Sequence, residues 1–188
     1  MRARALPAAA VLALALALPS PAVAADRVVT VSDAGYSPDV VRLTLGSRVE
    51  FTFVDPGHSA TSDVGFFDTG VQTGGLEREW FWASGSYRYH CTAHPSTTGR
   101  VRVPPRATEE TDGGWLLWWA DADAPDTTTY DVQVRRRGAD AWRDLRSDTT
   151  DASASFDPAR RGPWKVRARA VLTASGATSG WSPVLRLS

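Results

Sequence analysis

Apolar and polar residues alternate along most of the chain between residues 26 and 104, and this pattern predicts β-strands. The sets of every second residue that we expect to face inward are Val41, Leu43 and Leu45; Val49, Phe51 and Phe53; Tyr87, Tyr89 and Cys91; and Val101 with Val103. A period of two places such residues on one face of a strand. The three-to-four spacing of an amphipathic helix is missing, and glycine or proline interrupts nearly every run. We therefore predict an all-β fold, an antiparallel sandwich or barrel.

A second alternating pattern follows Pro104-Pro105 and predicts a second sandwich over residues 113–188. Its clearest strands are "TYDVQVRRR" and "WKVRARAVL". In "WLLWWADAD" the adjacent Trp118 and Trp119 leave open which of the two is buried, because a shift of one residue exchanges the faces of a strand. The polar stretch at 105–112 is either a linker or a weak first strand.

The first 25 residues have the pattern of a secretory signal peptide. Arg2 and Arg4 precede the apolar run "AAAVLALALAL", and "PAVAAD" offers small residues for cleavage near Ala24-Ala25. No other run is long enough to span a bilayer as a helix. We expect a secreted protein, extracellular or periplasmic, without a membrane span.

The charge of the mature chain is close to balanced. Without Arg2 and Arg4, 19 basic residues remain against 21 acidic ones, a net charge of about −2, and the basic residues form no block. A nucleic acid is therefore not an expected partner.

The single cysteine and the three histidines are the candidate chemistry of this chain. A free thiol is a liability in an oxidising compartment, so something should bury or occupy Cys91; the simplest alternative is a buried small hydrophobe. A mononuclear blue copper site needs two imidazoles and one thiolate in a trigonal plane. His58, Cys91 and His94 offer this set if their strands lie side by side. His90 has the outward phase of its strand, which favours a solvated side chain.

The segment from Val28 to Val103 resembles the cupredoxins, in particular the plastocyanin and amicyanin type. The likeness rests on "AGYSPDVVRLTLGSRVEFTFVD", "HSATSDVGFFDTG" and "GSYRYHCTAHPSTTGRVRV". The resemblance implies a Greek-key β-sandwich over residues 26–104 that binds one copper ion per chain. It also implies that the equatorial ligands are His58, Cys91 and His94, and that the activity is one-electron transfer with a redox partner protein of unknown identity.

The fourth ligand of that family is an axial methionine three residues after the loop histidine, and here Thr97 stands at that position. The only methionine is Met1, inside the predicted signal peptide. Weak axial donors in such sites include backbone oxygens. The alternatives for the axial side are Thr97 as a weak ligand or none, the carbonyl of Gly57, a water molecule, or an empty position.

The segment over about residues 106–188 resembles the fibronectin type III family. The likeness rests on "WLLWWADAD", "YDVQVRRRGADAWRDL", "WKVRARAV" and "SGWSP". It implies an immunoglobulin-like sandwich that acts as a spacer or contacts a protein or a polysaccharide. Arg167 and Arg169, which alternate with apolar residues, are predicted to lie on the exposed face of a strand.

Three functions stay open at this point. The leading one is a blue copper protein for electron transfer; the alternatives are extracellular copper capture or delivery without electron transfer, and a copper-free interaction module. An enzyme is not expected, because three histidines and one cysteine build neither a catalytic triad nor a second metal cluster.

Overall fold

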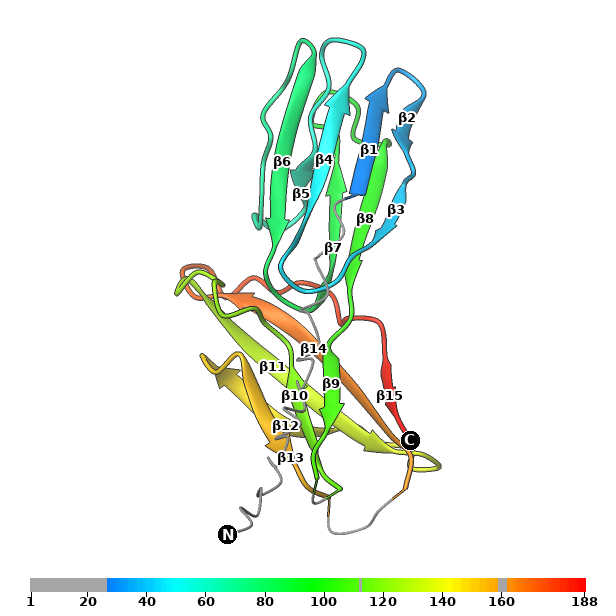
Figure 1. The fold of residues 1–188 in the computed structure, drawn as a ribbon. Coiled ribbons are helices and arrows are strands. Elements are labelled where there is room, and N and C mark those ends of the chain that lie inside the picture. The colour runs from blue at the N-terminus through cyan, green and yellow to red at the C-terminus, as the bar shows by residue number, and fades with distance from the viewer. Residues whose placement is uncertain (1–26, 112, 159–161) are drawn as a thin grey trace, which may run out of the picture.

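The computed structural model describes residues 27–111, 113–158 and 162–188, and within these ranges the chain forms strands and loops (Figure 1). The predicted signal peptide lies outside the described residues. Among the described residues, no helix has the length and apolar character needed to cross a membrane.

Residues 27–103 form the first sandwich, the upper half of the molecule in Figure 1. One of its sheets has the strand order β2-β1-β4-β6 and the other the order β3-β8-β7-β5. The strands are β1 (Arg27–Ser32), β2 (Gly35–Ser37), β3 (Val40–Arg42), β4 (Ser47–Phe53), β5 (Thr61–Ser62), β6 (Gly75–Phe81), β7 (Gly85–His90) and β8 (Thr98–Val103).

The first sandwich is mixed rather than purely antiparallel. Strand β1 runs parallel to β4, and β3 runs parallel to β8, whereas the other pairs are antiparallel. The predicted antiparallel arrangement was wrong for these two pairs. Alternation shows which face of a strand is buried, but it carries no information on the direction of the neighbouring strand.

The core of this sandwich lies between its two sheets. The alternation predicted for β4 and β7 is confirmed, since Val49, Phe51, Tyr89 and Cys91 are fully buried and the residues between them are not. The ring of Tyr89 packs edge-on against Phe51, with 5.4 Å between the ring centroids. The interior beneath the loops after β4 and β7 is therefore tightly filled with aromatic rings, which gives those loops a firm base.

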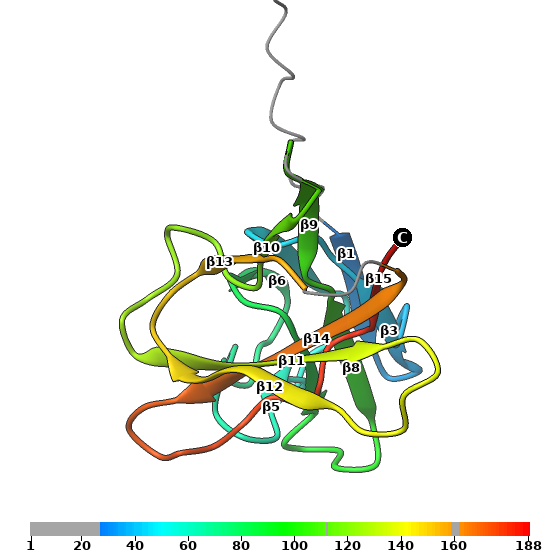
Figure 2. The ribbon, with the colours of Figure 1, turned by 90° about the horizontal axis from the view of Figure 1, so that it is seen from below.

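The second sandwich packs a sheet of order β13-β10-β9 on a sheet of order β12-β11-β14-β15, and Figure 2 shows the two layers from below. The strands are β9 (Arg106–Glu109), β10 (Trp115–Trp118), β11 (Thr128–Arg136), β12 (Arg143–Thr149), β13 (Ser153–Phe156), β14 (Trp164–Leu172) and β15 (Leu185–Leu187).

Packing decides the two points that the sequence left open in this half. Trp119 is fully buried, and Trp118 lies outside with the guanidinium of Arg106 4.7 Å from its ring centroid. The polar stretch after Pro105 contains strand β9, which pairs with β10, so it is a first strand rather than a free linker.

The two sandwiches are joined end to end by backbone hydrogen bonds as well as by the chain itself. The amide of Ser84 donates to the carbonyl of Trp119 (2.6 Å), and Ser86 and Gly180 exchange two bonds of 2.8 and 2.9 Å. Strand β7 starts at this junction and runs away from it for six residues, about 20 Å at the usual rise per residue. Cys91, which follows β7, is therefore at the far end of the first sandwich.

Candidate metal centre

His58, Cys91 and His94 come together at the far end of the first sandwich. The Sγ of Cys91 lies 3.8 Å from Nδ1 of His58 and 3.6 Å from Nδ1 of His94, and the three donor atoms lie within 4.8 Å of one another. Cys91 and His58 are buried, whereas His94 is exposed. Two imidazole nitrogens and one sulfur thus face a common point from two separate loops.

The separations fit a metal ion at that point. Metal–sulfur bonds of about 2.3 Å and metal–nitrogen bonds of about 2.0 to 2.1 Å, the values known for zinc, give a sulfur–nitrogen separation of about 3.5 to 3.8 Å for tetrahedral to trigonal angles. The observed 3.6 and 3.8 Å agree with this range. The distances from Cys91 to the two histidines thus match those expected around a bound metal ion.

The loop that carries Cys91 and His94 is closed by its own backbone. The amide of His94 donates to the carbonyl of Cys91 (3.1 Å), the amide of Thr97 donates to the carbonyl of His94 (2.8 Å), and the amide of Cys91 donates to the carbonyl of Thr97 (3.1 Å). These bonds hold the thiol and the imidazole on one side of the loop. The donor geometry is therefore a property of the folded chain.

The loop that carries His58 is held on both sides. The backbone carbonyl of Gln72 accepts from the amide of Gly57 (2.8 Å), and the backbone amide of Gln72 donates to the carbonyl of His58 (2.8 Å). Gly57 has a φ of 82°, in the left-handed region that glycine adopts without strain. The Nε2 of His58 lies 3.0 Å from the Oδ1 of Asp33. With its proton on Nε2, the ring offers its Nδ1 lone pair to the centre.

The surroundings of Cys91 favour its thiolate. Burial by itself raises the pKa of this thiol, but hydrogen bonds from the amide of Ser59 (3.4 Å) and from His94 and His58 together lower it from 9.0 to about 6. Burial likewise lowers the pKa of His58, but the bonds to Asp33 and to Cys91 outweigh it, so that this pKa is raised. The metal-free site is therefore set up as a thiolate beside imidazole groups, and a thiolate is the form that binds metals.

The low pKa of Cys91 gives a pH-dependent stability that can be measured without metal. The pKa of Cys91 in the folded protein, about 6, is below the ordinary value of 9.0. The thiolate therefore adds to the free energy of unfolding, fully above pH 9, and this contribution is lost as the pH falls to about 6. We expect the thiolate absorbance of the metal-free protein to titrate with a midpoint near 6. The Cys91→Ser variant, measured in parallel, should lack this titration; a midpoint near 9 in the parent protein would contradict the assignment.

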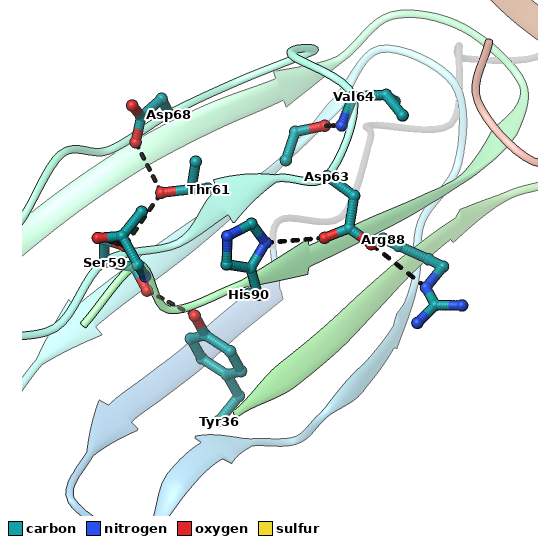
Figure 3. Close-up of polar contacts among 10 residues, drawn as sticks. Tyr36, Ser59, Thr61, Asp63, Val64, Asp68, Arg88 and His90 are labelled. Atoms are coloured by element: carbon teal, nitrogen blue, oxygen red, sulfur yellow. Dashed lines mark hydrogen bonds and ion pairs between the residues drawn. The ribbon is translucent and has the colours of Figure 1, made fainter. Parts of the chain in front are cut away.

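Ser59 connects the two ligand loops. Its hydroxyl lies 3.1 Å from that of Thr92 and accepts from the amide of Thr92 (3.0 Å), and its carbonyl accepts from the hydroxyl of Tyr36. Figure 3 shows Tyr36 directed at Ser59. Sequence reasoning missed both Ser59 and Asp33. The position of Ser59 directly after His58 was an available signal, but no local pattern ties Asp33 to a histidine 25 residues later.

His90 points away from the centre, as its outward phase predicts. Its Nδ1 lies 2.9 Å from Oδ1 of Asp63, and the other carboxylate oxygen of Asp63 lies 3.4 Å from Nε of Arg88 (Figure 3). Thr97 ends the ligand loop, with its methyl group 3.5 Å from where a Cβ on Gly35 would be. Thr97 and the Gly57 carbonyl stay predictions as axial donors.

No protein-family model and no curated protein matches the chain. Among solved structures, a purple cupredoxin from Nitrosopumilus maritimus is similar to 41% of this chain and 98% of its own, with 26% identity and a TM-score of 0.37. A copper-containing nitrite reductase from Thermus scotoductus is similar over 47% of this chain at 27% identity and a TM-score of 0.38, but this chain spans only 24% of its length. A reduced Cu(I) amicyanin variant is similar over 40% of this chain and 79% of its own, with 25% identity and a TM-score of 0.33.

Proposed function

We propose that residues 26–104 form a cupredoxin domain that binds one copper ion through His58, Cys91 and His94 and serves in one-electron transfer. The observation that carries this proposal is the convergence of two Nδ1 atoms on a fully buried cysteine whose pKa is lowered to about 6. One thiolate and two imidazoles are the equatorial set of blue copper sites. A structural zinc site takes four protein donors, and among the described residues no fourth His, Cys, Asp or Glu joins the three.

Electron transfer is favoured over copper capture or delivery by the way the ligands are held. Copper supplies the change between Cu(II) and Cu(I), and the protein's part is to keep the donors nearly fixed through it. The backbone bonds of residues 91–97, the Gln72 bonds around His58 and the Ser59 contacts all act in this direction. His94 is the exposed ligand and offers the point of approach for a redox partner. A site for metal release would need looser loops.

A copper-free interaction module explains the site less well. Such a module has no use for an imidazole pair directed at a thiol of lowered pKa, and a buried hydrophobe at position 91 would serve its core better. We do not propose an enzymatic activity, because three histidines and one cysteine build neither a catalytic triad nor a second metal cluster.

We also propose that residues 113–188, together with β9, form a fibronectin type III-like domain that positions the copper domain outside the cell. Support comes from a three-stranded antiparallel sheet facing a four-stranded one over the buried Trp115, Trp119 and Trp164. Export rests on the signal-peptide pattern of the first 25 residues.

A titration of the purified protein with Cu(II), followed by visible absorption and electron paramagnetic resonance, tests the function. We expect saturation at one equivalent and an intense thiolate-to-copper band. A colourless adduct would overturn the blue copper assignment. Reversible one-electron reduction of the coloured form tests electron transfer itself; a form that releases copper on reduction would favour delivery.

Asp33 is expected to tune the site through His58. Loss of an outer partner of a metal ligand costs about 10–100-fold in metal affinity. We expect Asp33→Asn to weaken Cu(II) binding within that range and to raise the reduction potential, because the carboxylate makes His58 a more basic donor. The matched control is Asp39→Asn, which removes an exposed carboxylate of the same sandwich that has no contact with His58. Equal effects of both variants would mean that only the net charge matters.

Thr97→Met is expected to lower the reduction potential while copper stoichiometry stays at one. A thioether on the axis stabilises Cu(II) more than Cu(I), and threonine is too short to act as that donor. Voltammetry of the copper-loaded protein measures the shift, and Thr98→Met, the exposed neighbour, is the control. A rise, or no change, would show that position 97 is not axial or that water already holds the axis.

A further inference from the structure

The outer face of the sheet β3-β8-β7 carries four arginines, Arg42, Arg88, Arg100 and Arg102, which we call the basic face. Each alternates with buried residues, so all four point away from the core. The strand register sets Arg102 beside Arg42 and Arg100 directly opposite Arg88. Like charges opposite one another on adjacent strands destabilise a sheet. The four arginines therefore destabilise this sheet, and since they point away from the core they do not contribute to its packing.

Acidic residues compensate only part of this charge. Asp63 pairs with Arg88 (3.4 Å) and also binds His90, as Figure 3 shows. Within the described part of the chain, the guanidinium groups of Arg100 and Arg102 make no ion pair or hydrogen bond, although both side chains are half-buried. Half-buried guanidinium groups without partners are ready to bind an anion.

The positive charge continues onto the second sandwich. The indole of Trp181 has the guanidinium groups of Arg167 and Arg169 at 4.3 and 4.7 Å from its ring centroid. Asp131 pairs with Arg169 at 2.8 Å, whereas Arg167 is bonded to the neutral amide of Gln133. Burial is the main cause that lowers the pKa of Arg167, and the nearby Arg135 and Arg169 lower it further.

Three adjoining hollows, of about 380, 180 and 240 Å³, share Arg100 as a lining residue. Two of them lie in the angle between the sandwiches, where Trp181 forms the opposite wall. The smallest has arginine, serine, proline and tryptophan in its lining and no acidic residue. The acidic residues of the other two are Asp63 and Asp39. An anion fits best beside Arg100 and Arg102.

We propose that this groove binds the sulfate or phosphate ester groups of an extended anionic polysaccharide. The guanidinium fork matches such oxoanions with paired hydrogen bonds. Arg100 and Arg102 stand about 7 Å apart along β8, so successive anionic groups of one chain can meet both. Hydroxyl groups of Ser86 and Thr178 on the wall suit sugar hydroxyls. The site is separate from the proposed copper centre.

Binding of dextran sulfate to the purified protein, measured by calorimetry at several salt concentrations, tests the proposal. We expect Arg100→Gln/Arg102→Gln to weaken binding at least about tenfold and to reduce the slope of log K against log salt by about one per arginine lost. The control, Arg27→Gln/Arg186→Gln, removes the same charge from exposed positions elsewhere and should leave affinity within about twofold. Equal weakening by both pairs would overturn the site.

The same binding measurement with other ligands identifies the class of ligand. Uncharged dextran should not bind, and inorganic sulfate should bind far more weakly than the polymer; sulfate binding as tight as the polymer would overturn the polysaccharide assignment. Tighter binding of polyglutamate or of duplex DNA would overturn it in favour of an acidic protein or a nucleic acid. Arg100→Lys/Arg102→Lys keeps the charge and the fold but loses the fork, so affinity should fall between parent and glutamine variant. Unchanged affinity in this variant would show that no paired hydrogen bonds form.

Discussion

Replacing Cys91 with serine is expected to abolish the intense visible absorption of the copper-loaded protein and to weaken copper binding. The band requires a sulfur-to-copper transition, and a serine hydroxyl is not ionised at neutral pH. The loss of affinity should exceed the about 10–100-fold that removal of an outer partner costs, because a ligand itself is lost. Cu(II) titration with visible absorption and electron paramagnetic resonance measures both effects.

The fold should survive this change, so that loss of the band can be assigned to the missing thiolate. Cys91 is fully buried next to the amide of Ser59 and the two imidazoles, and a serine hydroxyl can take over these hydrogen bonds. The matched control is His90→Gln, one residue earlier, whose side chain faces Asp63 instead of the centre. A blue band that persists in Cys91→Ser would remove Cys91 from the site, and a band that vanishes equally in His90→Gln would show that its loss is not specific to the thiol.

Residues that face the core could be predicted from the sequence because burial acts within a single strand. The alternation that ends in Tyr89 and Cys91 fixes the inward direction of the thiol, and the structure has both residues fully buried. The short spacing from Cys91 to His94 likewise brings two donors together within one loop. Local rules were sufficient for these features.

What escaped prediction depends on pairing between distant segments. Asp33 reaches His58 because the turn after β1 lies beside the loop after β4, and that proximity follows from the parallel pairing of β1 with β4. The basic face has the same origin, because only the register of β7 and β8 sets Arg100 opposite Arg88. Direction and register are set by the whole fold, so a single strand does not reveal them.

A fragment of residues 26–104 is expected to fold and bind one copper ion, with a lower free energy of unfolding than the full chain. The ligand loops lie at the end of β7 that is remote from the cut, so the donors keep their geometry. At the other end, Ser84 loses its bond to Trp119 and Ser86 loses both bonds to Gly180. Apolar surface around Tyr87 that faces Tyr130 and Ala170 becomes exposed. We expect a loss of about 2–4 kcal/mol.

Urea denaturation of the fragment and the full chain, with Cu(II) titration of both, checks this result. Gly180→Val in the full chain provides a matched perturbation, because a Cβ at this position would lie 3.1 Å from the carbonyl oxygen of Ser86 and would press the junction apart without removing the second sandwich. It should lose part of the stability that the fragment loses and keep its copper. A fragment as stable as the full chain would mean that the junction contributes nothing. A fragment that is unfolded, or that binds no copper while the full chain does, would mean that the first sandwich depends on the second and that Pro104 does not mark a boundary between independent units.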